Sequence, residues 1–143
     1  MAIILGARSL SRLEGVHPDL VRVVKRAAAT SDLDFTVLEG LRTIDRQKQL
    51  KAQGATKTMN SRHLTGHAVD LGALVGKEVR WDWSLYLRLA EIMRAASLAE
   101  KVPIRWGGTW KLLSALTGPI TSKNLSRTFP DGPHFELPKA SYP

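Results

Sequence analysis

The chain has 143 residues, of which 43% are hydrophobic and 24% are charged, a composition that suits one globular domain with a single core. Cysteine is absent, which excludes disulfides, thiolate metal sites and cysteine nucleophiles, so any catalytic metal must be held by histidine and carboxylate. Lysine and arginine number 21 and aspartate and glutamate 13, and the formal charge of +8 predicts attraction to a polyanion: nucleic acid, anionic lipid or an acidic cell-wall polymer.

The elements expected along the chain do not form a regular βαβ repeat. The N-terminal apolar stretch is too short for a signal peptide and nothing later approaches a membrane span, so we expect synthesis in a cytoplasm and no stable membrane insertion. Helices are expected from Pro18 onward, at 43–53 and at 83–101, and strands at 35–39, 67–71, 103–106 and 134–137. Interleaved strands without a repeat predict an α+β fold, and no linker divides residues 1–143 into more than one domain.

The stretch 107–132 is the least periodic part of the chain. It contains Gly-Gly, Gly-Pro and Pro-Asp-Gly turn signals around one apolar patch. A long irregular loop in a compact domain often lines or covers a site. We therefore expect this loop to be functional, with Trp106 and Trp110 beside the site.

Two of the four histidines, His63 and His67, stand four residues apart in SRHLTGHAVDL. That is the spacing of a helical zinc site, but the residues between them include no carboxylate and include Gly66, which disfavours a helix. If 67–71 is a strand, Asp70 faces one side while His67, Val69 and Leu71 face the other. Asp70 can then share a face with His63 from the preceding turn.

A third ligand is available in DGPHFEL, where His134 begins a second short strand. By the same alternation His134 and Glu136 share one face, with Phe135 and Leu137 packed behind. Two imidazoles and one carboxylate leave an open fourth position on zinc, as in catalytic sites. The spacing alone does not distinguish a zinc site from two polar turns at the edge of a hydrophobic core.

These residues carry a family resemblance. SRHLTGHAVDL resembles the S-x-H-x-x-G-x-A-x-D signature of zinc peptidases that cut peptidoglycan stem peptides, and DGPHFEL resembles their D-x-P-H-F-E signature. EGLRT at 39–43 and RWGGTW at 105–110 resemble further segments of the family, so the likeness spans about residues 34–137. The family comprises D-alanyl-D-alanine carboxypeptidases and dipeptidases and the L-alanyl-D-glutamate endopeptidases of bacteriophage lysins.

The resemblance implies a small α+β fold shared with the hedgehog signalling domain, with a short antiparallel sheet and flanking helices. It assigns zinc to three residues that the strand alternation also brings together: His63, Asp70 and His134. It also implies roles in the reaction. Asp131 is the general base, with Glu136 as the alternative base or a residue that orients a ligand; Arg42 opposes the oxyanion; Ser61 contacts substrate. Thr109 departs from the family, which often has Asp there.

The aspartate at position 131, the short chain and the lack of an export signal favour the phage endolysin branch: a monomeric L-alanyl-D-glutamate endopeptidase that lyses the host. The alternative is a D-alanyl-D-alanine carboxypeptidase. A nucleic-acid-binding module is disfavoured because the basic residues are scattered singly along the chain. The tryptophans are also expected elsewhere, two at a helix start and two beside the site. A catalytically inactive wall-binding relative is disfavoured by Asp131. We expect the partner to be peptidoglycan, with no separate cell-wall-binding domain and with release through a holin.

Overall fold

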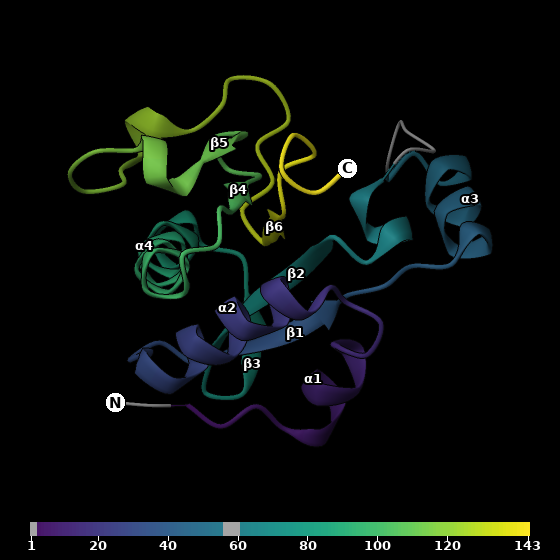
Figure 1. Ribbon diagram of the computed structural model, residues 1–143, viewed down its shortest axis with the longest axis horizontal. Coiled ribbons are helices and arrows are strands. Elements are labelled where there is room, and N and C mark those ends of the chain that lie inside the picture. The colour runs from purple at the N-terminus through teal and green to yellow at the C-terminus, as the bar shows by residue number, and fades with distance from the viewer. Residues whose placement is uncertain (1–2, 56–60) are drawn as a thin grey trace.

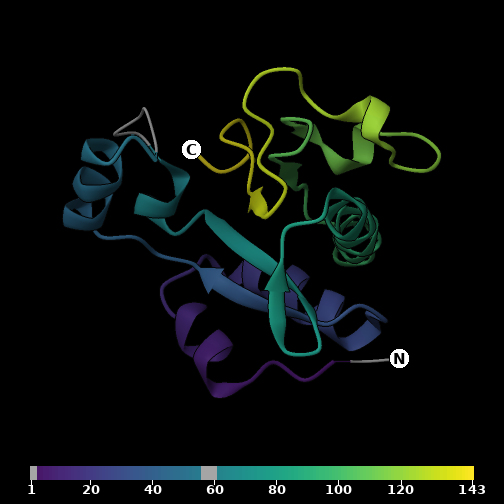
Figure 2. The ribbon, with the colours of Figure 1, turned by 180° about the vertical axis from the view of Figure 1, so that it is seen from behind.

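The protein is a single α+β unit built on one antiparallel sheet (Figures 1 and 2). The computed structural model describes residues 3–55 and 61–143. The helices are α1 (Ala7–Arg12), α2 (Pro18–Thr30), α3 (Ile44–Ala52) and α4 (Trp83–Glu100), and the 3-10 turns are η1 (Arg62–Thr65), η2 (Leu113–Ala115) and η3 (Ser122–Asn124). The strands are β1 (Phe35–Glu39), β2 (Ala68–Val75), β3 (Glu78–Arg80), β4 (Arg105–Trp106), β5 (Lys111–Leu112) and β6 (His134–Glu136).

The strands follow the order β1-β2-β6-β4-β5, and β3 also pairs with β2. Every pairing is antiparallel. The expected α+β fold is confirmed. All three expected helices and all four expected strands are present, although the strand expected at 67–71 begins at Ala68 and continues to Val75.

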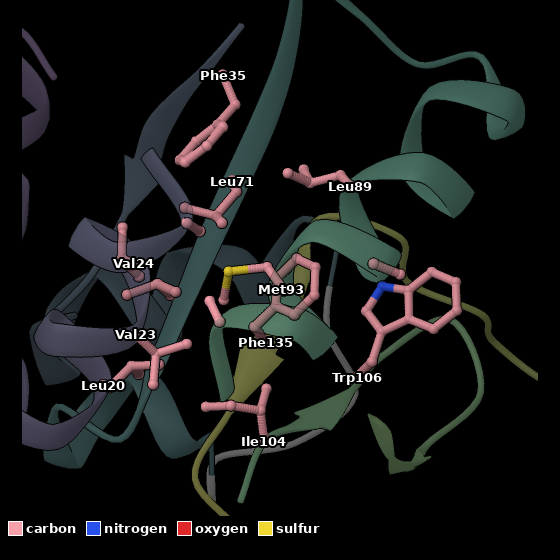
Figure 3. Close-up of a cluster of buried hydrophobic side chains, with 14 of the residues drawn as sticks. Leu20, Val23, Val24, Phe35, Leu71, Leu89, Met93, Ile104, Trp106 and Phe135 are labelled. Atoms are coloured by element: carbon pink, nitrogen blue, oxygen red, sulfur yellow. The ribbon is translucent and has the colours of Figure 1, made fainter. Parts of the chain in front are cut away.

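The core lies between the sheet and the two long helices, α2 and α4 (Figure 3). The side chains of Val69, Leu71 and Ala73 alternate along β2 into this core, as a strand requires. Helix α2 contributes an apolar stripe that includes Leu20 and Val24, both fully buried. The opposite face of β2 is left for the site, and Asp70 lies there.

Helix α1 was not expected from the sequence, and it protects the edge of the sheet. The hydroxyl of Ser9 accepts a hydrogen bond from the backbone N–H of Val37 at 3.0 Å, and an Arg12 Nη1 donates to the Val37 carbonyl at 2.9 Å. These side chains give strand β1 the partners that a further strand would supply. Just beyond them, the register of β1 against β2 shifts between Val37 and Glu39, a bulge that re-aims the end of the strand toward the site.

Strand β3 was also missed. It returns from β2 through a two-residue turn, Gly76 and Lys77, with φ of 58° and 72°. Positive φ at both positions is the type I′ hairpin geometry, for which glycine is favoured but lysine is uncommon. No helix in the described part of the chain has the length and apolar character to cross a bilayer.

Candidate active site

Three side chains from separate elements meet on the open face of the sheet. His63 comes from η1, Asp70 from the middle of β2, and His134 from the start of β6. One potential ligand atom from each lies within 4.8 Å of the others. The Oδ1 atom of Asp70 is 3.2 Å from both His63 Nε2 and His134 Nδ1, and the two imidazole rings lie 5.1 Å apart. The structure thus brings together the three residues predicted as metal ligands.

The sheet register explains the meeting. Asp70 and His134 are direct partners across the β2–β6 ladder, so their side chains share a face. His63 reaches the same face because the chain turns at Gly66, which has φ of 75°. A Cβ atom at Gly66 would lie 2.4 Å from the Gly15 carbonyl oxygen, so this turn requires glycine both for its backbone conformation and for space.

Each histidine is held through its other ring nitrogen. His63 Nδ1 donates to the Gly40 carbonyl at 2.9 Å, and His134 Nε2 donates to a carboxylate oxygen of Glu136 at 2.7 Å. These bonds fix the ring orientations, leaving His63 Nε2 and His134 Nδ1 directed at Asp70. Position 40 requires glycine, because a Cβ there would lie 2.1 Å from the Arg12 carbonyl oxygen. The donor set and its outer partners fit a divalent metal with nitrogen and oxygen ligands.

The protonation of the group reflects its burial. Burial alone would raise the pKa of Asp70, but the hydrogen bond with His134 and the contact with His63 hold it well below its ordinary value. Burial also opposes charge on His134, yet hydrogen bonds to Asp70 and Glu136 raise its pKa to about 9. Without a metal, His134 therefore carries a positive charge beside the carboxylates of Asp70 and Glu136.

His67 lies outside the group and just before the first residue of β2. Its Nδ1 is 2.6 Å from the Thr65 hydroxyl, and its ring lies 5.6 Å from that of His17. Burial lowers the pKa of His67 most, and the nearby charge of Arg62 lowers it further. His17 has the local role expected beside a helix start, because its ring accepts a hydrogen bond from the backbone N–H of Asp19 at 3.1 Å.

Asp131 lies beside the group of His63, Asp70 and His134, in the turn that leads into β6. Its backbone N–H donates to the Gly107 carbonyl at 2.9 Å, and a Cβ at Gly107 would lie 2.3 Å from the Asp131 carbonyl oxygen. Burial raises the pKa of its carboxyl, and the neighbouring charge of Asp70 raises it further. Glu136 is differently placed, since its two carboxylate oxygens face His134 and Arg105.

Arg42 is positioned by a set of side chains at the end of β1 and the start of α3. Its Nε lies 2.8 Å from Glu39 Oε1, and a second guanidinium nitrogen also contacts that oxygen. Its Nη1 donates to Gln47 Oε1 at 2.7 Å and to the Ser61 hydroxyl at 3.4 Å. The sequence had placed Gln47 on a polar helix, but it is fully buried and helps to fix the guanidinium.

A cleft of about 900 Å³ contains these residues. It is lined by all the predicted site residues: Arg42, Ser61, His63, Asp70, Asp131 and His134. The loop expected to line the site does so through Trp110 and Phe129–Asp131. Trp110 lies 5.5 Å from the His134 ring, and its Nε1 donates to the Phe129 carbonyl at 2.9 Å. Trp110 and Phe129 both have positive φ, at 56° and 49°, the kind of strain that gathers at functional sites.

Neither Trp106 nor Thr109 lines the cleft. Trp106 was expected beside the site, but it is fully buried in the core and donates from Nε1 to the Gly132 carbonyl at 2.8 Å. That part of the prediction was wrong, because the short strand β4 directs Trp106 inward beside Phe135. Thr109, the expected departure from the family pattern, is buried, and its hydroxyl accepts a hydrogen bond from the backbone N–H of Lys111 at 3.2 Å.

A His-Asp-His group that could hold a metal ion, beside a second carboxylate in the cleft of a small α+β domain, is the arrangement found in metal-dependent hydrolases. Comparison with known families narrows this class. The family described as phage L-alanyl-D-glutamate peptidase matches residues 1–138, and the chain belongs to that family.

Individual relatives agree with the family. The L-alanyl-D-glutamate peptidase of Escherichia phage T5 is 28% identical over 141 residues, which cover 96% of this chain and 99% of that protein. The peptidoglycan L-alanyl-D-glutamate endopeptidase CwlK of Bacillus subtilis is 27% identical over 128 residues, covering 80% of this chain and 66% of that protein. The crystal structure of the L-Ala D-Glu endopeptidase ChiX of Serratia marcescens superposes with a TM-score of 0.80 at 41% identity, covering 96% of this chain and 91% of that one. These matches confirm the family and fold predicted from the two motifs.

Proposed function

We propose that this protein is a zinc-dependent endopeptidase that hydrolyses the bond between L-alanine and D-glutamate in the stem peptides of bacterial peptidoglycan. The observation that carries the proposal is the buried group of His63, Asp70 and His134 beside Asp131, in a chain of the L-alanyl-D-glutamate peptidase family. A role in host-cell lysis, as a phage endolysin released with the help of a holin, is part of the same proposal.

The donor set supports zinc in particular. Two imidazole nitrogens and one carboxylate oxygen are the ligands of catalytic zinc sites that keep a position open for water or substrate. The outer hydrogen bonds from His63 to Gly40 and from His134 to Glu136 are the usual way in which such ligands are oriented. When bound, zinc supplies Lewis acidity to the scissile carbonyl and to a water molecule.

Asp131 is the proposed proton carrier. A carboxylate beside the ligand group can accept the proton of the attacking water and return it to the leaving amine. Burial and the nearby Asp70 raise the pKa of Asp131, which makes it a better proton acceptor than an exposed aspartate. Glu136 is already engaged with His134 and Arg105, which supports an orienting role for it.

Arg42 is proposed to oppose the negative charge that develops on the carbonyl oxygen. Its guanidinium lines the cleft and is held by Glu39 and Gln47, so little reorganisation is needed when that charge appears. Ser61 lies at the same end of the cleft, where its hydroxyl contacts Arg42 and is available to substrate.

Mass spectrometry of peptidoglycan digested by the zinc-loaded protein tests the proposal. The expected products are stem-peptide fragments with a new amino terminus on glutamate, and Asp131→Asn should form them far more slowly. Release of free D-alanine, with the alanine–glutamate bond intact, would show the carboxypeptidase activity of the alternative reading. Absence of any cleavage by the wild-type protein would refute a peptidase function.

A further inference from the structure

The basic side chains that line the cleft outnumber the acidic ones among the described residues. Among the described residues, five basic side chains line it, together with four acidic ones that include the metal-ligand Asp70 and the proton carrier Asp131. Bound zinc would add two further positive charges. The cleft is therefore suited to a substrate that itself carries negative charge.

Three of the five basic side chains are already engaged. Arg42 is paired with Glu39. Arg105 is paired with Glu136 at 3.3 Å and stacks over the Trp110 ring, 5.0 Å from its centroid. Arg62 uses one Nη2 atom to donate to the carbonyls of Leu137 and Tyr142 and has no acidic partner among the described residues. These arginines hold the walls of the cleft in place.

Arg46 is one of the two cations that remain. It lies in the first turn of α3, where its backbone N–H is bonded to the hydroxyl of Thr43, the N-cap residue, at 3.1 Å. Its side chain is exposed, lines the cleft and contacts no carboxylate among residues 3–55 and 61–143. The next residue, Gln47, is bonded to Arg42, so the helix turn that bears Arg46 is fixed relative to the catalytic arginine.

Lys139 is the other cation, on the segment that follows β6. This segment is anchored on both sides of Lys139: the Leu137 N–H donates to the His67 carbonyl at 2.9 Å, and the Tyr142 hydroxyl donates to Asp19 at 2.6 Å. Arg62 ties the same segment to η1, the turn that carries His63. Lys139 is exposed, lines the cleft and has no carboxylate partner in the described part of the chain.

The substrate of the proposed function offers a matching anion. Glutamate has two carboxyl groups, and in an alanyl-glutamyl stem peptide only one of them continues the chain. The other stays free, and negatively charged, unless it is amidated. It lies within a few bonds of the scissile amide, so it must be accommodated inside or at the rim of the cleft.

We propose that Arg46 and Lys139 form a subsite for this free carboxylate and make the protein selective for stem peptides in which it is not amidated. This inference rests on the proposed function and specifies its substrate. An exposed ion pair contributes modestly, so we expect each charge to give about a four- to fivefold preference and the two together about a 20-fold preference in kcat/KM.

The test uses two soluble stem tripeptides that differ only at this group, one with the free carboxylate and the other with a carboxamide. The zinc-loaded wild-type protein should cleave the carboxylate form about 20 times more efficiently, mainly through a lower KM. In Arg46→Gln with Lys139→Gln this preference should fall toward one, while kcat for the carboxamide peptide stays unchanged. The control, Lys48→Gln with Lys123→Gln, removes the same charge from residues that do not line the cleft and should keep the preference.

The other outcomes overturn the subsite. Equal cleavage of both peptides by the wild-type protein would show that the free carboxylate is not recognised. A preference that survives in the Arg46 and Lys139 variant would place recognition elsewhere. An equal loss on both peptides would show that these residues only support the structure. Failure of the wild-type protein to cleave either peptide would refute the proposed function itself, and the subsite with it.

Discussion

Metal binding should displace a proton from His134, and this can be measured. In the metal-free protein, hydrogen bonds to Asp70 and Glu136 outweigh the effect of burial and raise the His134 pKa to about 9. The imidazole therefore keeps its proton throughout the neutral range. The nitrogen that faces Asp70 must lose that proton before it can bind a metal.

The magnitude follows from the pKa. At pH 7, about two units below the pKa of about 9, nearly every molecule is protonated at His134, so zinc binding should release about one proton from this residue. At about pH 9 the contribution of His134 should be about half a proton. Below that pH, loss of one proton on binding makes the apparent zinc affinity rise about tenfold for each pH unit.

Isothermal titration calorimetry of the chelator-treated protein, in buffers of different ionisation enthalpy, counts the protons released. Glu136→Gln is the informative variant, because it removes a charge that holds the His134 proton and leaves an amide oxygen that can still accept the hydrogen bond. Its proton release should therefore decline at a lower pH than in the wild-type protein. A water molecule on the zinc contributes equally to both proteins and cancels in the comparison. Identical proton counts at every pH, or no release at pH 7, would refute this account of the site.

Three further predictions concern the ligands, the reaction and the surface charge. His134→Ala should lose most of its bound zinc in elemental analysis while His67→Ala keeps it, because His67 lies outside the ligand group; equal loss would contradict the assignment. Asp131→Asn should bind zinc and fold, yet hydrolyse peptidoglycan about 100- to 10,000-fold more slowly, as expected for loss of a general base; an active Asp131→Asn beside an inactive Glu136→Gln would exchange their roles. Lysis of cells with a permeabilised outer membrane should fall with added salt more steeply than cleavage of a short neutral stem peptide, because attraction of the +8 chain to an anionic wall is screened beyond about 10 Å. Equal losses in the two assays would show that the charge does not recruit the protein to the wall.

The meeting of His63, Asp70 and His134 on one face could be predicted in part because strand alternation is a local property. Val69 and Leu71 must face the core, so Asp70 must face the other way, and the same argument places His134 opposite Phe135. The pairing that makes Asp70 and His134 neighbours is not local, since 64 residues separate them in the chain. Two motifs in the right order supplied that long-range information through the resemblance to a family.

The supporting residues could not be predicted in this way. Gln47 lies in helix α3, whose polar composition predicts exposure to solvent. Only the fold shows that Gln47 is buried against Arg42. Trp110 and Phe129 form part of the cleft wall through positive-φ conformations that their residue types do not suggest. Trp106 was misplaced because alternation within a two-residue strand gives too little periodicity to decide which of two nearby tryptophans faces inward.

The two faces of strand β2 have different roles: one packs in the hydrophobic core and the other carries Asp70 of the candidate site. One face of it, with Val69, Leu71 and Ala73, is packed beneath α2 and α4, and removal of apolar atoms there would cost stability without touching the cleft. The other face places Asp70 against the two histidines, where the buried carboxylate is tolerated because His134 carries a balancing proton. A metal ion bound by the proposed ligands would compensate the same carboxylate in place of this proton. The strand can therefore hold a charged group at the wall of the cleft, because His134 or a bound cation compensates its charge.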